Sequence, residues 1–297
     1  MSGLRLLVLA AASAVVPPPA ASTPDIVVKG QRPVQRAQTR KAVGTIAKPA
    51  AQGGFGWQYA RWDEPVCMMV AGLPAAGGRF VADRIGQIAR RAGAEVEEPG
   101  CRPNIYVIIA PDPAAFVSGA TKKRAGLLQG LGGAEIARLG KSNDPVRWAS
   151  VTTVTSSQGD PMIKANSGAG GASFGNARMN TLAQWRASTI YASTSTHLAR
   201  MVVLVDGRRA QGLSYRALAD YIGLVSLAQL QPGADATMVD SILSLFRGKK
   251  DAPTGLTRFD TAFLHALYTV DPAMPGETQR QMIIGAIDRA LATMSAP

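Results

Sequence analysis

The stretch LARMVVLVD (residues 198–206) is almost wholly apolar and rich in β-branched residues, which is typical of a strand covered on both faces in the centre of a sheet. After a short loop, YRALADYIGLVSLAQ (residues 215–229) has the apolar spacing of a buried helix, and Ser214 before it is a suitable N-cap. A buried strand that leads into a buried helix indicates a sheet with helices packed against it.

The N-terminal half adds a strand, a helix and a strand. Residues 66–71 and 104–110 have the composition of short buried strands, and residues 77–92 between them have helical spacing. Phe80, Ile85 and Ile88 are expected on the apolar side of this helix. The order predicts a βαβ-like unit if the two strands are parallel.

The remaining elements complete an α+β pattern. Short helices are expected at residues 112–116, 122–128 and 132–139, strands at 147–156 and 188–195, a short apolar turn at 239–246, and helices at 257–270 and 277–294. Thr257, with Asp260 three residues later, is the expected cap of the first of these C-terminal helices. The glycine-rich residues 164–176 lack the Lys-Ser/Thr ending of a phosphate loop and are expected to connect a hairpin. We therefore predict an α+β fold, a mixed β-sheet with packed helices and a helical C-terminal part.

The N-terminus has the features of an export signal. Arg5 is followed by the apolar run LLVLAAASAVV (residues 6–16), three prolines, and the small residues that signal peptidase accepts, so residues 1–22 are expected to be removed. Residues 23–55 are expected to form a flexible basic tail rich in Pro and Ala. Residues 56–297 are expected to form one exported domain, with an N-terminal half to about residue 145. These features predict a periplasmic or secreted protein with no transmembrane span after signal removal.

Charge and cysteine content limit the function classes. The formal net charge is +12, but the basic residues are spread along the chain without an aromatic-interleaved stripe, which argues against a nucleic-acid partner. A solvated basic face explains the charge, and attraction to an anionic envelope surface is the alternative. The cysteines are Cys67 and Cys101, and export favours a disulfide between them. A catalytic cysteine paired with a histidine is the competing interpretation.

Few residues are candidates for catalysis. The histidines are His197, in a strand-like stretch, and His265, within an apolar helix, and each is best explained as a structural residue. The sequence contains no GxSxG, HExxH, CxxC or Walker motif. Ser193 and Ser195 lie near His197, but one strand supplies no third group to orient the imidazole. The catalytic residues therefore stay unknown, and no cofactor is expected.

The order of the C-terminal elements resembles a known architecture. The apolar strand ending at Asp206, the helix ALADYIGLVSLAQL, the turn SILSLF and the segment LTRFDTAFLHALY are similar to the C-terminal part of metzincin-like zinc peptidases, in particular the secreted bacterial family DUF2927. The resemblance covers about residues 187–270. It implies a buried helix at the position of the zinc ligands, a turn that runs beneath the metal position, and a final helix that closes the core.

The sequence departs from that family at the zinc positions. The helix has Asp220 and Tyr221 where a peptidase has His and Glu, and Leu224 where it has the second His. The turn SILSLF lacks the methionine after which the metzincin methionine turn is named, although Met238 is close by. A catalytic zinc needs three protein ligands, and this helix supplies at most one. We therefore expect a zincin-like scaffold without a metal site, acting as a binding or structural envelope protein on an unidentified partner. An extracytoplasmic, peptidase-like hydrolase with unidentified catalytic residues is the alternative.

Overall fold

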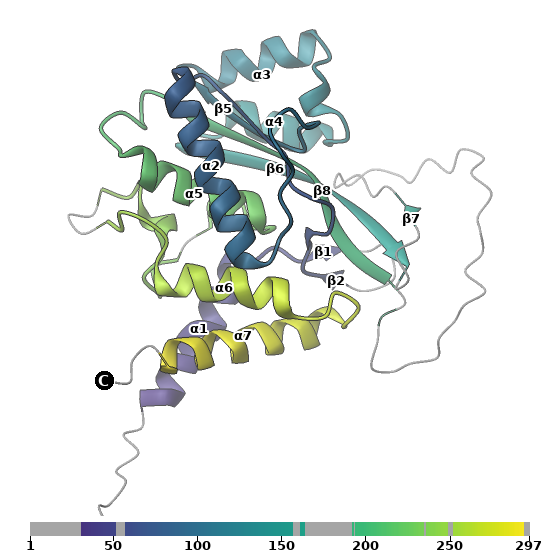
Figure 1. The fold of residues 1–297 in the computed structure, drawn as a ribbon, viewed down its shortest axis with the longest axis vertical. Coiled ribbons are helices and arrows are strands. Elements are labelled where there is room, and N and C mark those ends of the chain that lie inside the picture. The colour runs from purple at the N-terminus through teal and green to yellow at the C-terminus, as the bar shows by residue number, and fades with distance from the viewer. Residues whose placement is uncertain are drawn as a thin grey trace, which may run out of the picture.

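Strand β8 (Thr194–Asp206) lies at the centre of a mixed sheet. The computed structural model describes residues 31–51, 57–156, 161–163, 192, 194–234, 236–248 and 252–293, and its fold is shown in Figure 1. Across the sheet the order is β4, β5, β8, β6 and β7, and β3 pairs with the first half of β8. The other strands are β3 (Arg61–Trp62), β4 (Met68–Ala71), β5 (Ile105–Ala110), β6 (Val146–Ser156) and β7 (Pro161–Ile163).

The two faces of the second half of β8 face two different cores, which explains the apolar sequence of that half. Met201, Val203 and Val205 are buried in a large core on one face, whereas Val202 and Leu204 are buried in a smaller core on the other. Side chains alternate between the two faces of a strand, so where both faces are covered, consecutive residues are buried and tend to be apolar. The prediction of a central strand at residues 198–206 is confirmed.

Helices cover both faces of the sheet. The large core takes in side chains from α1 (Gln31–Ile46), α2 (Ala75–Ala92), α5 (Tyr215–Leu227), α6 (Arg258–Thr269) and α7 (Gly276–Thr293). The smaller core is closed by α3 (Pro113–Lys122), the short helix η1 (Gly126–Leu128) and α4 (Gly133–Lys141). Figure 1 shows α2 and α5 on one side of the sheet and α3 and α4 on the other. The predicted α+β fold with a mixed sheet and packed helices is confirmed.

The expected βαβ unit is formed by β4, α2 and β5. The strands β4 and β5 are parallel, with Val70 opposite Val107. On α2, Ile85 and Ile88 are buried as expected, but Phe80 is 45% exposed and Val81 takes its place in the core. The prediction for Phe80 is wrong because it lies five positions before Ile85, whereas Val81 lies four positions before it, on the same helical face.

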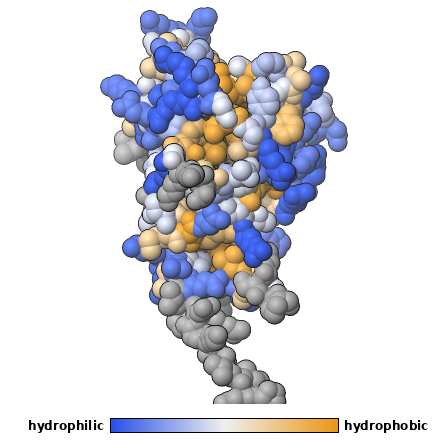
Figure 2. Space-filling view, turned by 90° about the vertical axis from the view of Figure 1, so that its left-hand side faces the viewer, coloured by the Kyte–Doolittle hydropathy of each residue, from blue (hydrophilic) through white to orange (hydrophobic). Residues whose placement is uncertain are grey.

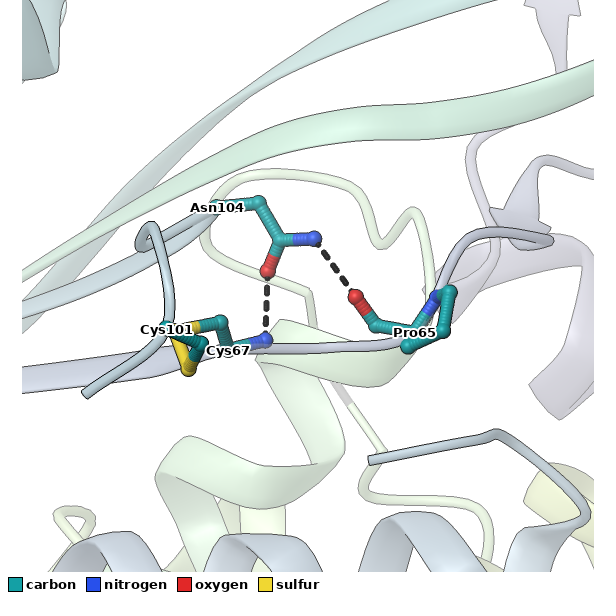
Figure 3. The surroundings of a disulfide bond; sticks show 4 residues. All are labelled: Pro65, Cys67, Cys101 and Asn104. Carbon is teal, nitrogen blue, oxygen red and sulfur yellow. Dashed lines mark hydrogen bonds between the residues drawn. A yellow bond between two sulfur atoms is a disulfide. The ribbon is translucent and has the colours of Figure 1, made fainter. Parts of the chain in front are cut away.

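A disulfide between Cys67 and Cys101 ties the start of β4 to the loop before β5, with Cα atoms 6.1 Å apart (Figure 3). Asn104 secures the same junction, since its side-chain oxygen accepts a hydrogen bond from the Cys67 N–H at 2.8 Å and its amide donates to the Pro65 carbonyl at 3.0 Å. The predicted pairing is confirmed. Closing a loop of this length stabilises the fold by about 3 to 4 kcal/mol in the chain-entropy description.

The structure differs from the expectation for the N-terminal tail. Residues 31–46 form α1, and Ala42, Val43 and Ile46 are fully buried in the large core. These side chains share one helical face and pack where α1 meets α7, a partner more than 200 residues away that composition does not reveal. Beyond α1, the short strands β1 (Ala50–Ala51) and β2 (Trp57–Gln58) pair with each other. Structured chain thus begins well before the expected residue 56.

The helix expected at residues 122–128 is only partly formed, because α3 ends at Lys122 and the chain turns before η1. Other expectations are confirmed or lie outside the described residues. Ser214 caps α5 by accepting from the Ala217 N–H at 3.1 Å, and Thr257 caps α6 together with Asp260. The expected signal peptide, the glycine-rich residues 164–176 and residues 188–191 lie outside the described residues. No helix in the described ranges is both long and apolar enough to cross a membrane.

Candidate functional site

Helix α5 is the element on which the metzincin-like resemblance depends, and it is buried along almost its whole length. Every residue from 217 to 227 is buried. The helix packs between α2, α6 and strand β8, so that even its polar positions lie in the interior. A polar group buried in this way needs hydrogen-bond partners within the protein. The contacts of Asp220 and Tyr221 therefore show whether either side chain is available to bind a metal.

Asp220 is bound to an arginine. Arg84 of α2 donates from Nε to Oδ1 at 2.5 Å and from Nη2 to Oδ2 at 3.0 Å, and the Leu256 N–H donates to Oδ2 at 2.9 Å. Asp220 is fully buried, and its hydrogen bonds raise the pKa of Arg84 further above its ordinary value. A Cβ at Gly255 would lie 2.8 Å from Oδ2, so the loop before α6 passes directly over the carboxylate. Asp220 therefore joins α2, α5 and this loop.

Tyr221 and Leu224 are packed as core residues. The Tyr221 ring meets the Phe246 ring edge to face, with centroids 5.3 Å apart. Burial raises the pKa of the Tyr221 hydroxyl well above its ordinary value, so the side chain stays a neutral phenol. Leu224 is 0% exposed within the large core. Of the two α5 positions matched to the zinc-binding histidines, Asp220 is bound to Arg84 and Leu224 has no ligand atom, and Tyr221 has a neutral phenol at the position matched to the glutamate.

The turn after α5 is held by a carboxylate that the sequence analysis recognised only as part of a helix cap. Asp260 of α6 accepts hydrogen bonds from Ser241 Oγ at 2.6 Å and from the Ile242 N–H at 2.8 Å, in addition to the Thr257 N–H and Oγ1. Burial raises the pKa of Asp260, and these four hydrogen bonds oppose that effect. The short helix η2 (Ile242–Ser244) is thereby fixed against α5.

The two histidines lie apart from α5 and have separate surroundings. His197 on β8 is 7% exposed, and its Nε2 is 3.0 Å from Thr155 Oγ1 on β6. Its Nδ1 has no hydrogen-bond partner among the described residues, and the nearest carboxylate oxygen, Oδ1 of Asp63, is 4.0 Å away. His265 is exposed on α6. Within the described ranges, no three His, Cys, Asp or Glu side chains are grouped so that they could hold a metal ion.

The serines weighed as nucleophiles are not brought to His197 as a reactive group. Ser195 is buried on β8, two positions before His197 on the same strand. Ser193 lies outside the described residues. The hydroxyl that does reach the imidazole belongs to Thr155 of the neighbouring strand, and sequence reasoning missed it because that contact depends on the register between β6 and β8.

A groove of about 700 Å³ opens where α1, α6 and α7 meet the loops before and after η2. We call it the α6 groove, because the N-terminal turn of α6 forms one wall. Its lining combines amide, hydroxyl, guanidinium and apolar side chains from five segments of the chain: Gln35, Gln38, Thr39, Arg216, Met238, Val239, Asp240, Thr254, Gly255, Leu256, Thr257, Arg258, Phe259 and Leu291. A volume of this size is within the range of small-ligand sites.

Apolar side chains also reach the surface beside this region. Figure 2 shows the side of the molecule on which α2 and α5 lie in Figure 1, and hydrophobic residues are exposed along its middle between hydrophilic margins. Phe80 and Tyr215 are each 45% exposed and lie with ring centroids 6.4 Å apart, where α2 meets α5. Met238, which lines the α6 groove, is 39% exposed. The groove therefore offers apolar contact as well as charge.

Comparisons of the chain with models of protein families, with curated proteins and with solved structures gave no match. The class of the site therefore has to be argued from its own geometry. Among the described residues, that site comprises a largely buried ion pair between α2 and α5, a turn held by the Asp260 carboxylate, and an open groove beside them.

The surroundings of His197 predict a loss of stability in mild acid. Burial lowers its pKa below the ordinary value of 6.5, while Asp63 and Glu64 raise it and Arg61 lowers it by smaller amounts. The unfolded chain therefore binds a proton on this histidine at a higher pH than the folded protein does. We expect the free energy of unfolding to fall as the pH drops below about 6.5, until the folded-state pKa is passed. Each pH unit between the two pKa values corresponds to about 1.4 kcal/mol.

This prediction is checked by urea unfolding between about pH 8 and pH 5, together with an NMR titration of the His197 ring. The variant His197→Gln should lose this part of the pH dependence, whereas His265→Gln, on the exposed side of α6, should keep it. A His197 pKa at or above 6.5 in the folded protein would contradict the prediction.

Proposed function

We propose that this chain is an exported, non-catalytic protein with a zincin-like scaffold that acts by binding a partner at the cell envelope. One observation carries the proposal: the α5 position with the best ligand chemistry, Asp220, is committed to Arg84 and to the Leu256 N–H. A carboxylate that neutralises a partly buried guanidinium cannot be withdrawn to hold a metal without leaving that charge unpaired. Tyr221 and Leu224 supply no ligand in its place.

The order and contacts of the C-terminal elements support the zincin-like part of the proposal. The central strand β8 leads into the buried helix α5, η2 packs against α5, and α6 follows and also contacts α5. This is the sequence of elements that the resemblance implies. A fold of this kind does not by itself carry the chemistry of its relatives, and function has to be assigned from the site.

An extracytoplasmic location is part of the same proposal. The signal-like residues 1–22 support it, and so does the disulfide between Cys67 and Cys101, because such bonds persist in oxidising compartments. The excess of basic residues favours a partner with negative charge, either an envelope protein or an anionic surface.

A hydrolase is the second candidate, and the hydrogen bond between Thr155 and His197 is the observation that favours it. A hydroxyl beside an imidazole, with Asp63 on the other side of the ring, has the order of a nucleophile, a base and an orienting acid. The Asp63 oxygen lies 4.0 Å from Nδ1, beyond hydrogen-bond distance, and its side chain is 64% exposed. The imidazole is therefore not oriented as such a mechanism requires, and the binding role is better supported.

Metal analysis and a hydrolysis assay test the proposed function. Protein purified without chelator is expected to contain no stoichiometric zinc, to show no saturable zinc binding by calorimetry, and to leave fluorescent casein uncleaved with or without added zinc. Stoichiometric zinc together with casein cleavage that a chelator abolishes would overturn the proposal. Cleavage that is insensitive to chelator and lost in Thr155→Val would favour the hydrolase instead.

A further inference from the structure

We infer that the α6 groove binds an acidic, partly apolar peptide segment of a partner protein. The inference rests on the proposed binding role and names the chemistry of the partner. It is carried by the charges, the apolar contacts and the fixed walls of the groove.

The charged side chains of the groove favour a negative ligand. Arg216 and Arg258 line it, and Asp240 is the acidic side chain among its lining residues. Both arginines are exposed. Among the described residues, the Arg216 guanidinium has no hydrogen-bond or ion-pair partner, so it can bind a carboxylate without breaking an existing contact. A guanidinium binds a carboxylate through two parallel hydrogen bonds, which gives orientation as well as attraction.

Apolar side chains beside the arginines make the groove more than a charged surface. Met238, Val239, Leu256, Phe259 and Leu291 contribute to its lining. A concave site with apolar and cationic walls can enclose an extended chain that alternates acidic and apolar side chains. A flat membrane surface would reach the rim but leave these apolar walls unfilled.

The walls of the groove are held in place before any ligand arrives. The Leu256 N–H is bound to buried Asp220, and the Thr257 hydroxyl oxygen lies 2.7 Å from the Asp240 carbonyl oxygen. On the α1 side, Thr39 is 1% exposed and its hydroxyl donates to Asp288 Oδ1 of α7 at 2.8 Å. A groove with fixed walls binds with a smaller loss of conformational entropy than one that must first be ordered.

Fluorescence anisotropy with the full chain tests the inference. The probe is a fluorescein-labelled short peptide of alternating Glu and Leu, and the matched control peptide alternates Lys and Leu. We expect saturable binding of the acidic peptide that weakens with added salt, and no saturable binding of the basic peptide. Arg216→Glu should weaken binding at least about tenfold, which corresponds to about 1.4 kcal/mol. Arg102→Glu, an exposed change outside the groove, should leave it unchanged.

The inference would be overturned by the absence of saturable binding of the acidic peptide, by equal binding of both peptides, or by equal binding of the acidic peptide to the Arg216→Glu variant. Tighter binding to anionic phosphatidylglycerol vesicles than to the peptide, with the same sensitivity to Arg216→Glu, would overturn it in favour of a lipid surface. The zinc and casein measurements are independent of these results. A protein that is free of zinc and inactive on casein, yet does not bind the acidic peptide, would leave the proposed function standing and remove only this assignment.

Discussion

Replacing Asp220 by alanine is expected to lower the free energy of unfolding by about 3 to 5 kcal/mol, because the change leaves a partly buried guanidinium without its counter-charge. The Arg84 side chain is 15% exposed in the folded protein, and the Leu256 N–H would lose its acceptor as well. Urea unfolding followed by tryptophan fluorescence gives the free energy directly. Asp83→Ala, on the exposed side of α2, is the matched control and should change stability by no more than about 0.5 kcal/mol.

A double-mutant cycle isolates the interaction between the two side chains. Arg84→Met alone should also destabilise the protein, since it leaves the Asp220 carboxylate buried without a cation. The double variant Arg84→Met with Asp220→Leu should be less destabilised than the sum of the two single changes, by about 1 kcal/mol or more. Strict additivity, or a cost below about 1 kcal/mol for Asp220→Ala, would show that the carboxylate is not committed to Arg84 and would reopen its role as a metal ligand.

Replacing Asp260 by alanine is the second change with a large expected effect, a loss of about 3 kcal/mol in the free energy of unfolding. Its two oxygens accept from Ser241 Oγ, from the Ile242 N–H and from both donors of Thr257. Alanine would leave the buried Ser241 and Ile242 donors without acceptors and would also remove half of the capping box of α6. The loss should be visible in urea unfolding and as a lower midpoint of thermal unfolding.

Thr257→Ala distinguishes the role of Asp260 in capping α6 from its role in holding Ser241 and Ile242. This change removes the capping hydroxyl but keeps the Asp260 hydrogen bonds to Ser241 and Ile242, and it should cost only about 1 kcal/mol. Similar costs for the two variants would mean that Asp260 acts only as a helix cap and that the turn is held by other contacts. A larger cost for Asp260→Ala would support its role in fixing η2 against α5.

Several features of this protein were determined by the sequence itself. The strand at residues 198–206 and the helix that begins at Tyr215 were found because apolar periodicity and a serine cap are local signals. The same holds for the Thr257 and Asp260 pair, whose spacing of three residues is fixed by helix geometry. The Cys67–Cys101 bond followed from there being one possible pairing of two cysteines. For the strand, the helix and the cap, the physical cause lies within a few neighbouring residues. For the disulfide, two cysteines allow only one pairing.

Tertiary structure decided the remaining features, because their causes lie far apart in the chain. Asp220 and Arg84 are 136 positions apart, and no local pattern shows that α2 and α5 bring them together. Helix α1 was missed because it packs against α7, which lies more than 200 residues further along the chain, and Phe80 was misplaced because Val81 fits the face that α2 turns to the core. The α6 groove draws its walls from residues between 35 and 291. A sequence encodes which faces are apolar, but which faces meet is settled by how the assembled elements fill the space between them.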